Sequence, residues 1–132
     1  MFSRLAFFSW LVSIVAGAAF WVMAGRALVI GFDPGGSVMT YYAKAHASRD
    51  IQIKGDCASA CTMYLASSGV CVAPDARFWF HGGTEAIGTR IMLDSYPARV
   101  RSWALRSRAL ESQHLTMLSG ANLIAMGVRA CH

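Results

Sequence analysis

The stretch 51–67, IQIKGDCASACTMYLAS, combines the signals of a strand, a turn and a helix. Apolar and polar side chains alternate from Ile51 to Lys54, as in a half-buried strand, and Gly55-Asp56 is typical of a turn that ends a strand. From Ser59 to Ser67, bulky and small apolar residues follow one another and predict a closely packed helix. The stretch therefore predicts a strand-turn-helix unit with Ser59 at the turn.

Further elements of the same kind are predicted on both sides of this unit. In order, they are a strand at 27–32, a turn at 33–36, a helix from the N-cap Ser37 to about Ser48, and strands at 70–72 and 77–81. Strands that alternate with helices form parallel sheets through right-handed crossovers. The sequence thus predicts an α/β fold with a small, mainly parallel sheet and crossover helices.

Beyond Gly83 the chain becomes helical and basic. Pro97 suits the first turn of a helix. We expect the apolar positions of this helix, Val100, Trp103, Leu110 and Leu118, to face inward. A nucleic-acid surface would interleave basic residues with several exposed aromatic side chains, and Trp103 is the one aromatic residue within the arginine-rich stretch 99–108. We therefore interpret the arginines as a solvated face and expect no nucleic-acid partner.

The N-terminal residues differ in composition from the rest of the chain. No charged residue occurs from Leu5 to Gly25, and Arg4 and Arg26 flank this run. About 20 apolar residues can span a bilayer as a helix, while a basic start, an apolar segment and the small residues 16–18 (AGA) are also typical of a signal peptide. We expect an N-terminal apolar helix at residues 1–25, as anchor or cleaved signal, with a buried core helix as the alternative. The domain at 26–132 would then be membrane-anchored or exported, in a periplasmic or other extracytoplasmic location.

The chain holds four cysteines, Cys57, Cys61, Cys71 and Cys131. Cysteine of this density is ordinary in exported proteins and uncommon in cytosolic ones. One or two disulfides are compatible with the sequence, and free thiols are the alternative. The sequence has no Cys-x-x-Cys motif and no histidine pair at ligand spacing, so we expect no metal site.

Two side chains have the chemistry of a nucleophile and its base. A serine on a tight strand-to-helix turn, such as Ser59, exposes its hydroxyl near the positive end of the helix. An N-cap without catalytic function is the alternative interpretation of Ser59. His81 is the last residue of the strand predicted at 77–81, and imidazole can accept a serine proton near neutral pH. A structural hydrogen bond is the alternative for His81.

Backbone N–H groups near Ser59 could stabilise a negative oxygen. Gly35 and Gly36 lack a Cβ atom, so their N–H groups can approach a substrate oxygen closely. The N–H of Ala60, directly after the candidate nucleophile, would be the second donor. A plain turn is the alternative interpretation of the two glycines.

These features occur together in three segments, 34–38 (PGGSV), 57–62 (CASACT) and 73–81 (APDARFWFH). The first resembles the oxyanion loop of the Clp peptidase proteolytic subunit. The second resembles its nucleophile turn as it occurs in exported bacterial relatives, and the third resembles the strand that leads to the catalytic histidine. The resemblance covers about residues 27–128 and implies a short fold of the ClpP/crotonase superfamily.

The resemblance also implies a catalytic Asp just before 118–119 (LS), where this chain has 113–116 (QHLT). The carboxylate of such an Asp orients the histidine, and its loss can cost about 10⁴ in rate. Glu111 and Asp94 are the candidates for the third member. The segment between His81 and Leu118, which carries ring contacts in the family, is shorter in this chain. A homo-oligomer and a monomer are the alternatives for its assembly.

The combination predicts a serine hydrolase of the peptidase type that acts on a peptide or protein and needs no cofactor. The alternative is a catalytically inactive, membrane-associated binding module with the same fold, which the missing Asp favours. Acyl-CoA chemistry, as in the crotonases, is less favoured because an exported protein does not meet coenzyme A.

Overall fold

The computed structural model describes residues 25–47 and 50–132. In chain order the elements are β1 (Leu28–Asp33), α1 (Val38–Ala47), β2 (Ile51–Ala58), the 3₁₀ helix η1 (Ser59–Ala66), β3 (Val70–Val72), β4 (Arg77–Phe80), α2 (Ala86–Ser95), α3 (Ala98–Ser107), β5 (Thr116–Ser119) and α4 (Gly120–Ala125). The protein is mixed α/β, as predicted. The predicted anchor or signal falls on residues 1–25, of which 1–24 lie outside the described residues.

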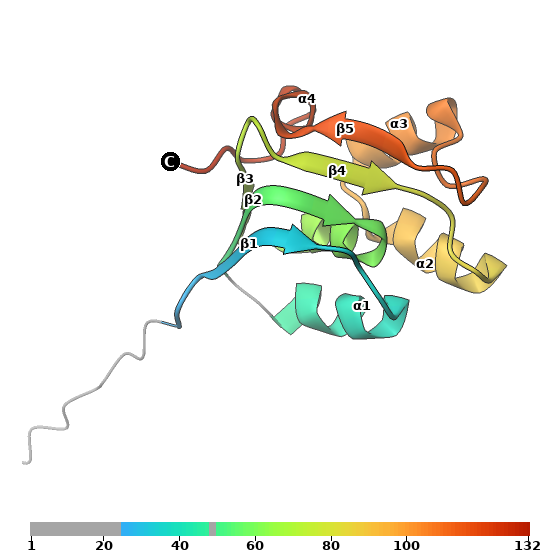
Figure 1. The fold of residues 1–132 in the computed structure, drawn as a ribbon, viewed down its shortest axis with the longest axis horizontal. Helices are drawn as coiled ribbons and strands as arrows, with labels where there is room; N and C mark the ends of the chain where they lie inside the picture. The colour runs from blue at the N-terminus through green and yellow to red at the C-terminus, as the bar shows by residue number, and fades with distance from the viewer. Residues whose placement is uncertain (1–24, 48–49) are drawn as a thin grey trace, which may run out of the picture.

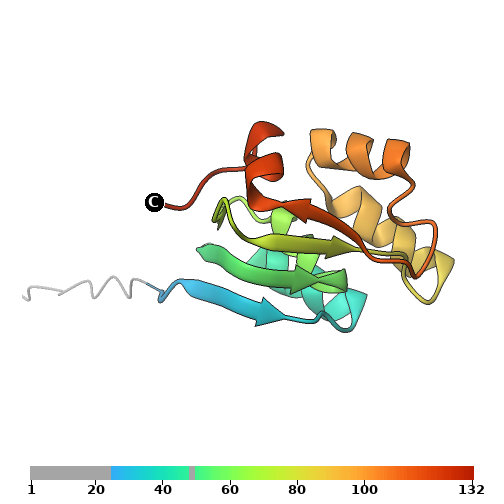
Figure 2. The same cartoon turned by 45° about the horizontal axis from the view of Figure 1, so that its top comes forward.

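The strands form one sheet with the order β1-β2-β4-β5, and β3 also pairs with β2 (Figure 1). Each of β1, β3 and β4 pairs with β2 in parallel. The last strand, β5, is antiparallel to β4, and Figure 2 shows the two arrows pointing in opposite directions. Three of the four pairings are therefore parallel, as alternating strands and helices require.

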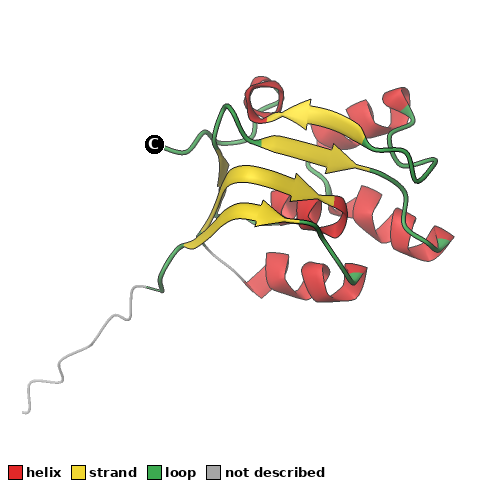
Figure 3. Ribbon diagram, in the orientation of Figure 1, coloured by secondary structure: helices red, strands yellow, loops and turns green. Residues whose placement is uncertain are grey.

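The helices α1, η1 and α2 lie against one face of this sheet (Figure 3). The fully buried side chains between the two layers include Ile51, Ile53, Cys57, Met63, Phe78 and Phe80. Phe80 makes edge-to-face contacts with Tyr96 and Trp103, with ring centroids 5.4 and 5.0 Å apart. Val100 is also buried. The inward direction predicted for Val100 and Trp103 is thus confirmed.

Strand β2 is longer than the sequence predicts. Gly55-Asp56 was expected to end the strand, but β2 continues through both residues to Ala58. A register shift between Ile30 and Phe32 brings the two backbones together, and a Cβ atom at Gly55 would lie 1.8 Å from the Gly31 oxygen. Gly55 is therefore needed for close approach of β1 rather than for a turn.

The region after Pro97 also differs from the prediction of one long inward face. Helix α3 ends at Ser107, because Arg108 adopts a left-handed conformation with φ of 57°. Leu110 is buried outside any helix, and Leu118 is buried in β5, opposite Phe78 of β4. Placing Leu118 on the helix was wrong because strand pairing with β4, which is distant in sequence, overrides the helical spacing.

All four cysteines are paired, Cys57 with Cys61 and Cys71 with Cys131. The interpretation of the cysteines as free thiols is therefore wrong. Within 25–47 and 50–132, no cluster of three or more His, Cys, Asp or Glu residues is arranged to hold a metal. The same part of the chain contains no helix with the length and apolar character needed to cross a membrane.

Candidate active site at the carboxyl edge of the sheet

Three strand ends meet at one edge of the sheet. Asp33, the last residue of β1, lies beside Cys57 of β2, and Ala58 lies beside Trp79 of β4. The segments that follow these strands carry the Gly35-Gly36 turn, Ser59 and His81. The carboxyl edge of a parallel sheet is where such folds bind ligands, so parallel pairing brings together the three segments selected from the sequence.

The backbone at Ser59 has an uncommon conformation. Its φ is 57°, in the left-handed region that residues other than glycine rarely adopt. The residue is the first of η1, whose N-cap is Ala58, so the N-cap interpretation of Ser59 is wrong. The hydroxyl of Ser59 has no hydrogen-bond partner in the described part of the chain. A serine on a sharp strand-to-helix turn with an unused hydroxyl has the geometry of a nucleophile elbow.

Two bonds hold this turn in place. The Cys57–Cys61 disulfide spans it, and both cysteines are fully buried. The hydroxyl of Thr62 donates to the Ser59 carbonyl at 2.7 Å and also contacts the Tyr96 hydroxyl at 2.7 Å. Burial raises the pKa of Tyr96, with the Thr62 hydrogen bond acting in the opposite direction, so Tyr96 remains a neutral phenol. The turn is therefore anchored to β2 and, through Tyr96, to the C-terminal side of α2.

Gly35 packs directly on the Ser59 turn. Its φ is 87°, and a Cβ atom there would lie 2.6 Å from the Ala58 oxygen and 2.8 Å from the Ser59 Cβ. Only glycine fits both the conformation and the space. The Gly35 N–H donates to Asp33 Oδ1 at 2.9 Å, so it is not free to bind an oxyanion. Gly35 is thus better described as the packing surface of the site than as a donor.

Two other backbone N–H groups remain as oxyanion donors. The Gly36 N–H has no hydrogen-bond partner within the described residues, and Gly36 lines the same cavity as Ser59. Ala60 is the second residue of η1, and N–H groups in the first turn of a helix have no acceptor within the helix. One donor, on Gly36, therefore belongs to a residue that lines the cavity, and the other, on Ala60, belongs to the buried residue that follows Ser59.

Asp33 and Tyr41 support the glycine turn, and sequence reasoning did not identify them. Asp33 Oδ1 accepts hydrogen bonds from Gly35 N–H and, at 2.6 Å, from the Tyr41 hydroxyl. Burial, followed by the hydrogen bond to Asp33, raises the pKa of Tyr41. Burial and the nearby Asp33 charge also raise the pKa of Tyr64, which contacts the Tyr41 ring. The signal available in the sequence was Asp two residues before Gly, which is typical of a turn closed by the Asp side chain.

His81 lies directly after β4 and is partly buried. Its Nδ1 lies 2.6 Å from the Gly82 carbonyl oxygen. A carbonyl oxygen only accepts, so Nδ1 carries the proton and Nε2 is the acceptor of the neutral ring. No hydrogen bond joins His81 to Ser59, although both side chains line one cavity. Catalytic hydrogen bonds are often absent or long before substrate binds.

Neither carboxylate proposed as the third member contacts His81. Glu111 is exposed and pairs with Arg108. Asp94 lies 3.9 Å from Arg90 Nε and lines a different cavity, between α1 and α2. From the segment where the family resemblance places an Asp, Gln113 Nε2 donates to the carbonyl oxygens of Gly82 and Gly83 at 2.8 and 3.0 Å.

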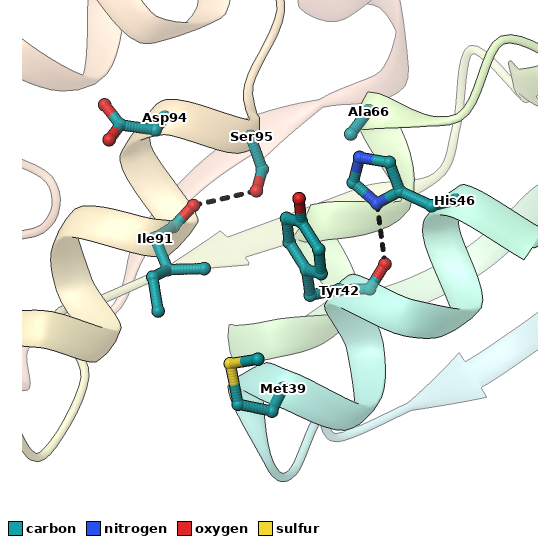
Figure 4. A pocket seen from close by; sticks show the side chains of 7 residues that line it. All are labelled: Met39, Tyr42, His46, Ala66, Ile91, Asp94 and Ser95. Carbon is teal, nitrogen blue, oxygen red and sulfur yellow. Dashed lines mark hydrogen bonds between the residues drawn. The ribbon is translucent and has the colours of Figure 1, made fainter.

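The cavity around Ser59 and His81 has a volume of about 420 Å³ and is mainly apolar. Besides Gly36, Ser59 and His81, its lining includes Val38, Met39, Ile87, Ile91, Met92 and Glu85. A second cavity of about 610 Å³ adjoins it, since Met39 and Ile91 line both. Figure 4 shows Tyr42 and His46 of α1 on one side of this second cavity and Ser95 of α2 on the other, with the Asp94 carboxylate directed away from α1.

In chemical terms, the first cavity is lined by the Ser59 hydroxyl, the His81 imidazole and Gly36 with its unpaired N–H group, while the Ala60 N–H follows Ser59 directly in the chain. These are the groups that acyl transfer requires. The sequence matches no protein-family model, and no curated protein matches it.

Proposed function

We propose that the protein is a serine hydrolase of the peptidase type, similar to the Clp peptidase proteolytic subunit in fold and site. The observation that carries the proposal is the conformation of Ser59. A φ of 57° at a non-glycine residue requires stabilisation by its surroundings, and here a disulfide, Thr62 and the Gly35 turn supply it. Backbone strain of this kind is concentrated at active sites.

In the proposed reaction, Ser59 Oγ attacks the carbonyl carbon of an amide or ester, and its proton passes to Nε2 of His81. The Gly36 and Ala60 N–H groups receive the oxygen that becomes negative. His81 then gives the proton to the leaving amine or alcohol as the acyl-enzyme forms. Water, deprotonated by His81, releases the acid and restores Ser59.

The mainly apolar lining of the cavity favours a substrate with an apolar side chain next to the scissile bond. A peptide or protein supplies such a group together with the amide that the reaction consumes. No cofactor is needed for this chemistry.

Export or membrane anchoring is part of the proposal. Two disulfides are typical of proteins that fold outside the reducing cytosol. The uncharged run from Leu5 to Gly25 supplies either a signal or an anchor. We therefore propose a substrate in the periplasm or near the outer surface of a membrane.

A catalytically inactive binding module with the same fold is the second candidate. The observation in its favour is that Nδ1 of His81 bonds a carbonyl oxygen rather than a carboxylate. A carbonyl stabilises the imidazolium less than a charged carboxylate does. The cavity would then bind a peptide without cleaving it.

Labelling by a fluorophosphonate probe separates the two candidates. The full chain, in detergent or lipid, should be labelled, as should the matched control Ser68→Ala, whose serine is exposed in the loop after η1. Ser59→Ala should not be labelled, and His81→Ala should react far more slowly. Equal labelling of Ser59→Ala, or no labelling of the wild type, would exclude the hydrolase and leave the binding module.

A further inference from the structure

The orientation of His81 depends on a single peptide unit, the one that joins Gly82 to Gly83. Its oxygen accepts the Nδ1–H of His81 at 2.6 Å. Its N–H, which belongs to Gly83, donates to the hydroxyl oxygen of Thr89 at 2.8 Å. The plane of this peptide therefore decides whether the ring has an acceptor.

Two glycines flank this peptide, and glycine backbones rotate more freely than any other. A rotation of the Gly82–Gly83 plane by half a turn would point the N–H, rather than the oxygen, at His81. The ring could then exchange its tautomer and present an N–H to Ser59, in which state it cannot accept the serine proton. Some contact must prevent that rotation if His81 is to act as a base.

Thr89 opposes the rotation on the N–H side of the peptide, and Gln113 supplies the contact on the oxygen side. Its Nε2 donates to the Gly82 oxygen at 2.8 Å and to the Gly83 oxygen at 3.0 Å. Both partners are carbonyl oxygens, so the amide nitrogen, and not the amide oxygen, must face them. One side chain thus fixes two consecutive peptide oxygens, and a carbonyl oxygen has the two lone pairs needed for both His81 and Gln113.

The backbone around Gln113 reinforces the arrangement. The Gly82 N–H donates to the Ser112 oxygen at 2.7 Å. A Cβ atom at Gly82 would lie 2.6 Å from the Leu110 oxygen, so the two segments are in direct contact. The segment that ends in Gln113 is therefore held beside the loop after His81.

We propose that Gln113 is a positioning residue that holds the Gly82 carbonyl on Nδ1 of His81 and so keeps Nε2 as the proton acceptor. This inference rests on the proposed function, in which His81 is the base. Gln113 performs with a neutral amide and a backbone carbonyl the orienting task that a carboxylate performs in a Ser-His-Asp triad. It does so without touching the substrate cavity.

Two measurements test the proposal on the full chain in detergent or lipid. The variants are Gln113→Ala, Gln113→Glu, which keeps the length but loses both donors, and His114→Ala, an exposed neighbour, as control. With an ester substrate, both Gln113 variants should lose about ten- to a hundredfold in kcat with little change in KM, as removal of an orienting partner does. His114→Ala should match the wild type.

The second measurement does not depend on activity. The ¹⁵N chemical shifts of the His81 ring distinguish a protonated from an unprotonated nitrogen, and the wild type should hold the proton on Nδ1. In Gln113→Ala the ring should become a mixture of tautomers, while an unchanged unfolding midpoint shows that the fold is intact.

An unchanged tautomer in Gln113→Ala would overturn the proposal, as would a rate loss in Glu111→Gln that exceeds the loss in Gln113→Ala. If Ser59→Ala hydrolyses the ester as fast as the wild type, the proposed function fails, yet the ring shifts still decide the role of Gln113.

Discussion

The two disulfides lie in regions that need them for different reasons. Cys57 and Cys61 are four residues apart and enclose Ser59, whose backbone is in the left-handed region. Cys71 and Cys131 are 60 residues apart and join β3 to the C-terminal segment. A short loop loses little chain entropy when it closes, whereas a long loop loses much more. The first bond therefore mainly fixes a local geometry, and the second mainly stabilises the fold.

The two regions also differ in the kind of hydrogen bond that holds them. The C-terminal segment pairs with β3 through its backbone: Val72 N–H donates to the Arg129 oxygen at 2.9 Å, and Cys131 N–H donates to the Val72 oxygen at 3.0 Å. The Ser59 turn is instead built from a positive φ, a glycine contact and side-chain bonds. We conclude that the Ser59 turn has a conformation that it would not keep without its neighbours.

The largest expected effect is the loss of the long disulfide. Replacing both Cys71 and Cys131 by Ala should lower the free energy of unfolding by about 4 kcal/mol, since the chain-entropy relation gives this value for a loop of about 60 residues. Urea unfolding under non-reducing conditions measures it. Ester hydrolysis should persist at temperatures well below the unfolding midpoint. A double variant within about 1 kcal/mol of the wild type would show that the backbone pairing alone holds this segment.

Two glycines with positive φ provide the next comparison, one in each region. Gly35→Ala should lower the free energy of unfolding by about 3 kcal/mol. The added Cβ atom is disfavoured by the left-handed backbone and would overlap with Ala58 and Ser59. Gly127 has a φ of 98° but open space around its Cβ position, so Gly127→Ala should cost only about 1 kcal/mol. Unfolding curves give both values, and probe labelling should be lost in the Gly35 variant alone. Equal costs would mean that Gly35 is not in contact with the Ser59 turn.

Removal of the short disulfide should reduce stability less than removal of the long one, but it should reduce the reactivity of Ser59 more. Replacing both Cys57 and Cys61 by Ala should lower the free energy of unfolding by about 2 kcal/mol, the value that the chain-entropy relation gives for so short a loop. The rate of probe labelling should nevertheless fall by about tenfold or more, since Ser59 loses the bond that spans its turn. Stability and labelling are measured on the same sample, with the Cys71/Cys131 double variant beside it. If the long-loop variant lost more labelling than the short-loop variant, the assignment of the two roles would be wrong.

The features of the fold that could be predicted from the sequence are those set by short segments and by the alternation of strands and helices. The strand-turn-helix order around Ser59 and the meeting of three strand ends follow from local turns and from the parallel pairing that crossovers impose. Gly55-Asp56 was predicted to end the strand because the pair is typical of a turn, but β2 stays extended there through its pairing with β1 and β4, which are distant in sequence. Leu118 misled for the same reason, because β5 exists through its pairing with β4.

The sequence allowed the main residues of the candidate site to be chosen, but it did not allow their hydrogen-bond partners to be predicted. Ser59 and His81 could be selected from their places after strands, and both line one cavity. The use of the Gly35 N–H by Asp33 and the acceptor of His81 Nδ1 depend on side-chain directions that no spacing encodes. The third member was predicted to be a carboxylate, Glu111 or Asp94, whereas the side chain that reaches the His81 loop is an amide, Gln113.

The smallest expected effect concerns Asp56, which precedes Cys57 on β2. Its carboxylate bonds the Arg77 guanidinium through two contacts of 2.7 Å and accepts from Trp79 Nε1 at 3.2 Å. The hydrogen bond from Arg77, then the one from Trp79, hold the pKa of Asp56 below its ordinary value of 3.8. A carboxylate with a lowered pKa in the folded state adds stability above the unfolded pKa, and this contribution is lost as the pH falls through the folded pKa. Wild type should therefore be slightly more stable than Asp56→Asn at neutral pH, and the difference should shrink below about pH 4 and in high salt. Thermal unfolding from pH 7 to pH 2 measures this, with Arg77→Gln as the partner variant that should show the same loss. A stability difference between wild type and Asp56→Asn that grows as the pH falls would contradict the ion pair. A large difference at pH 7 would mean that this pair, rather than the neighbouring disulfide, fixes the end of β2 that precedes Ser59.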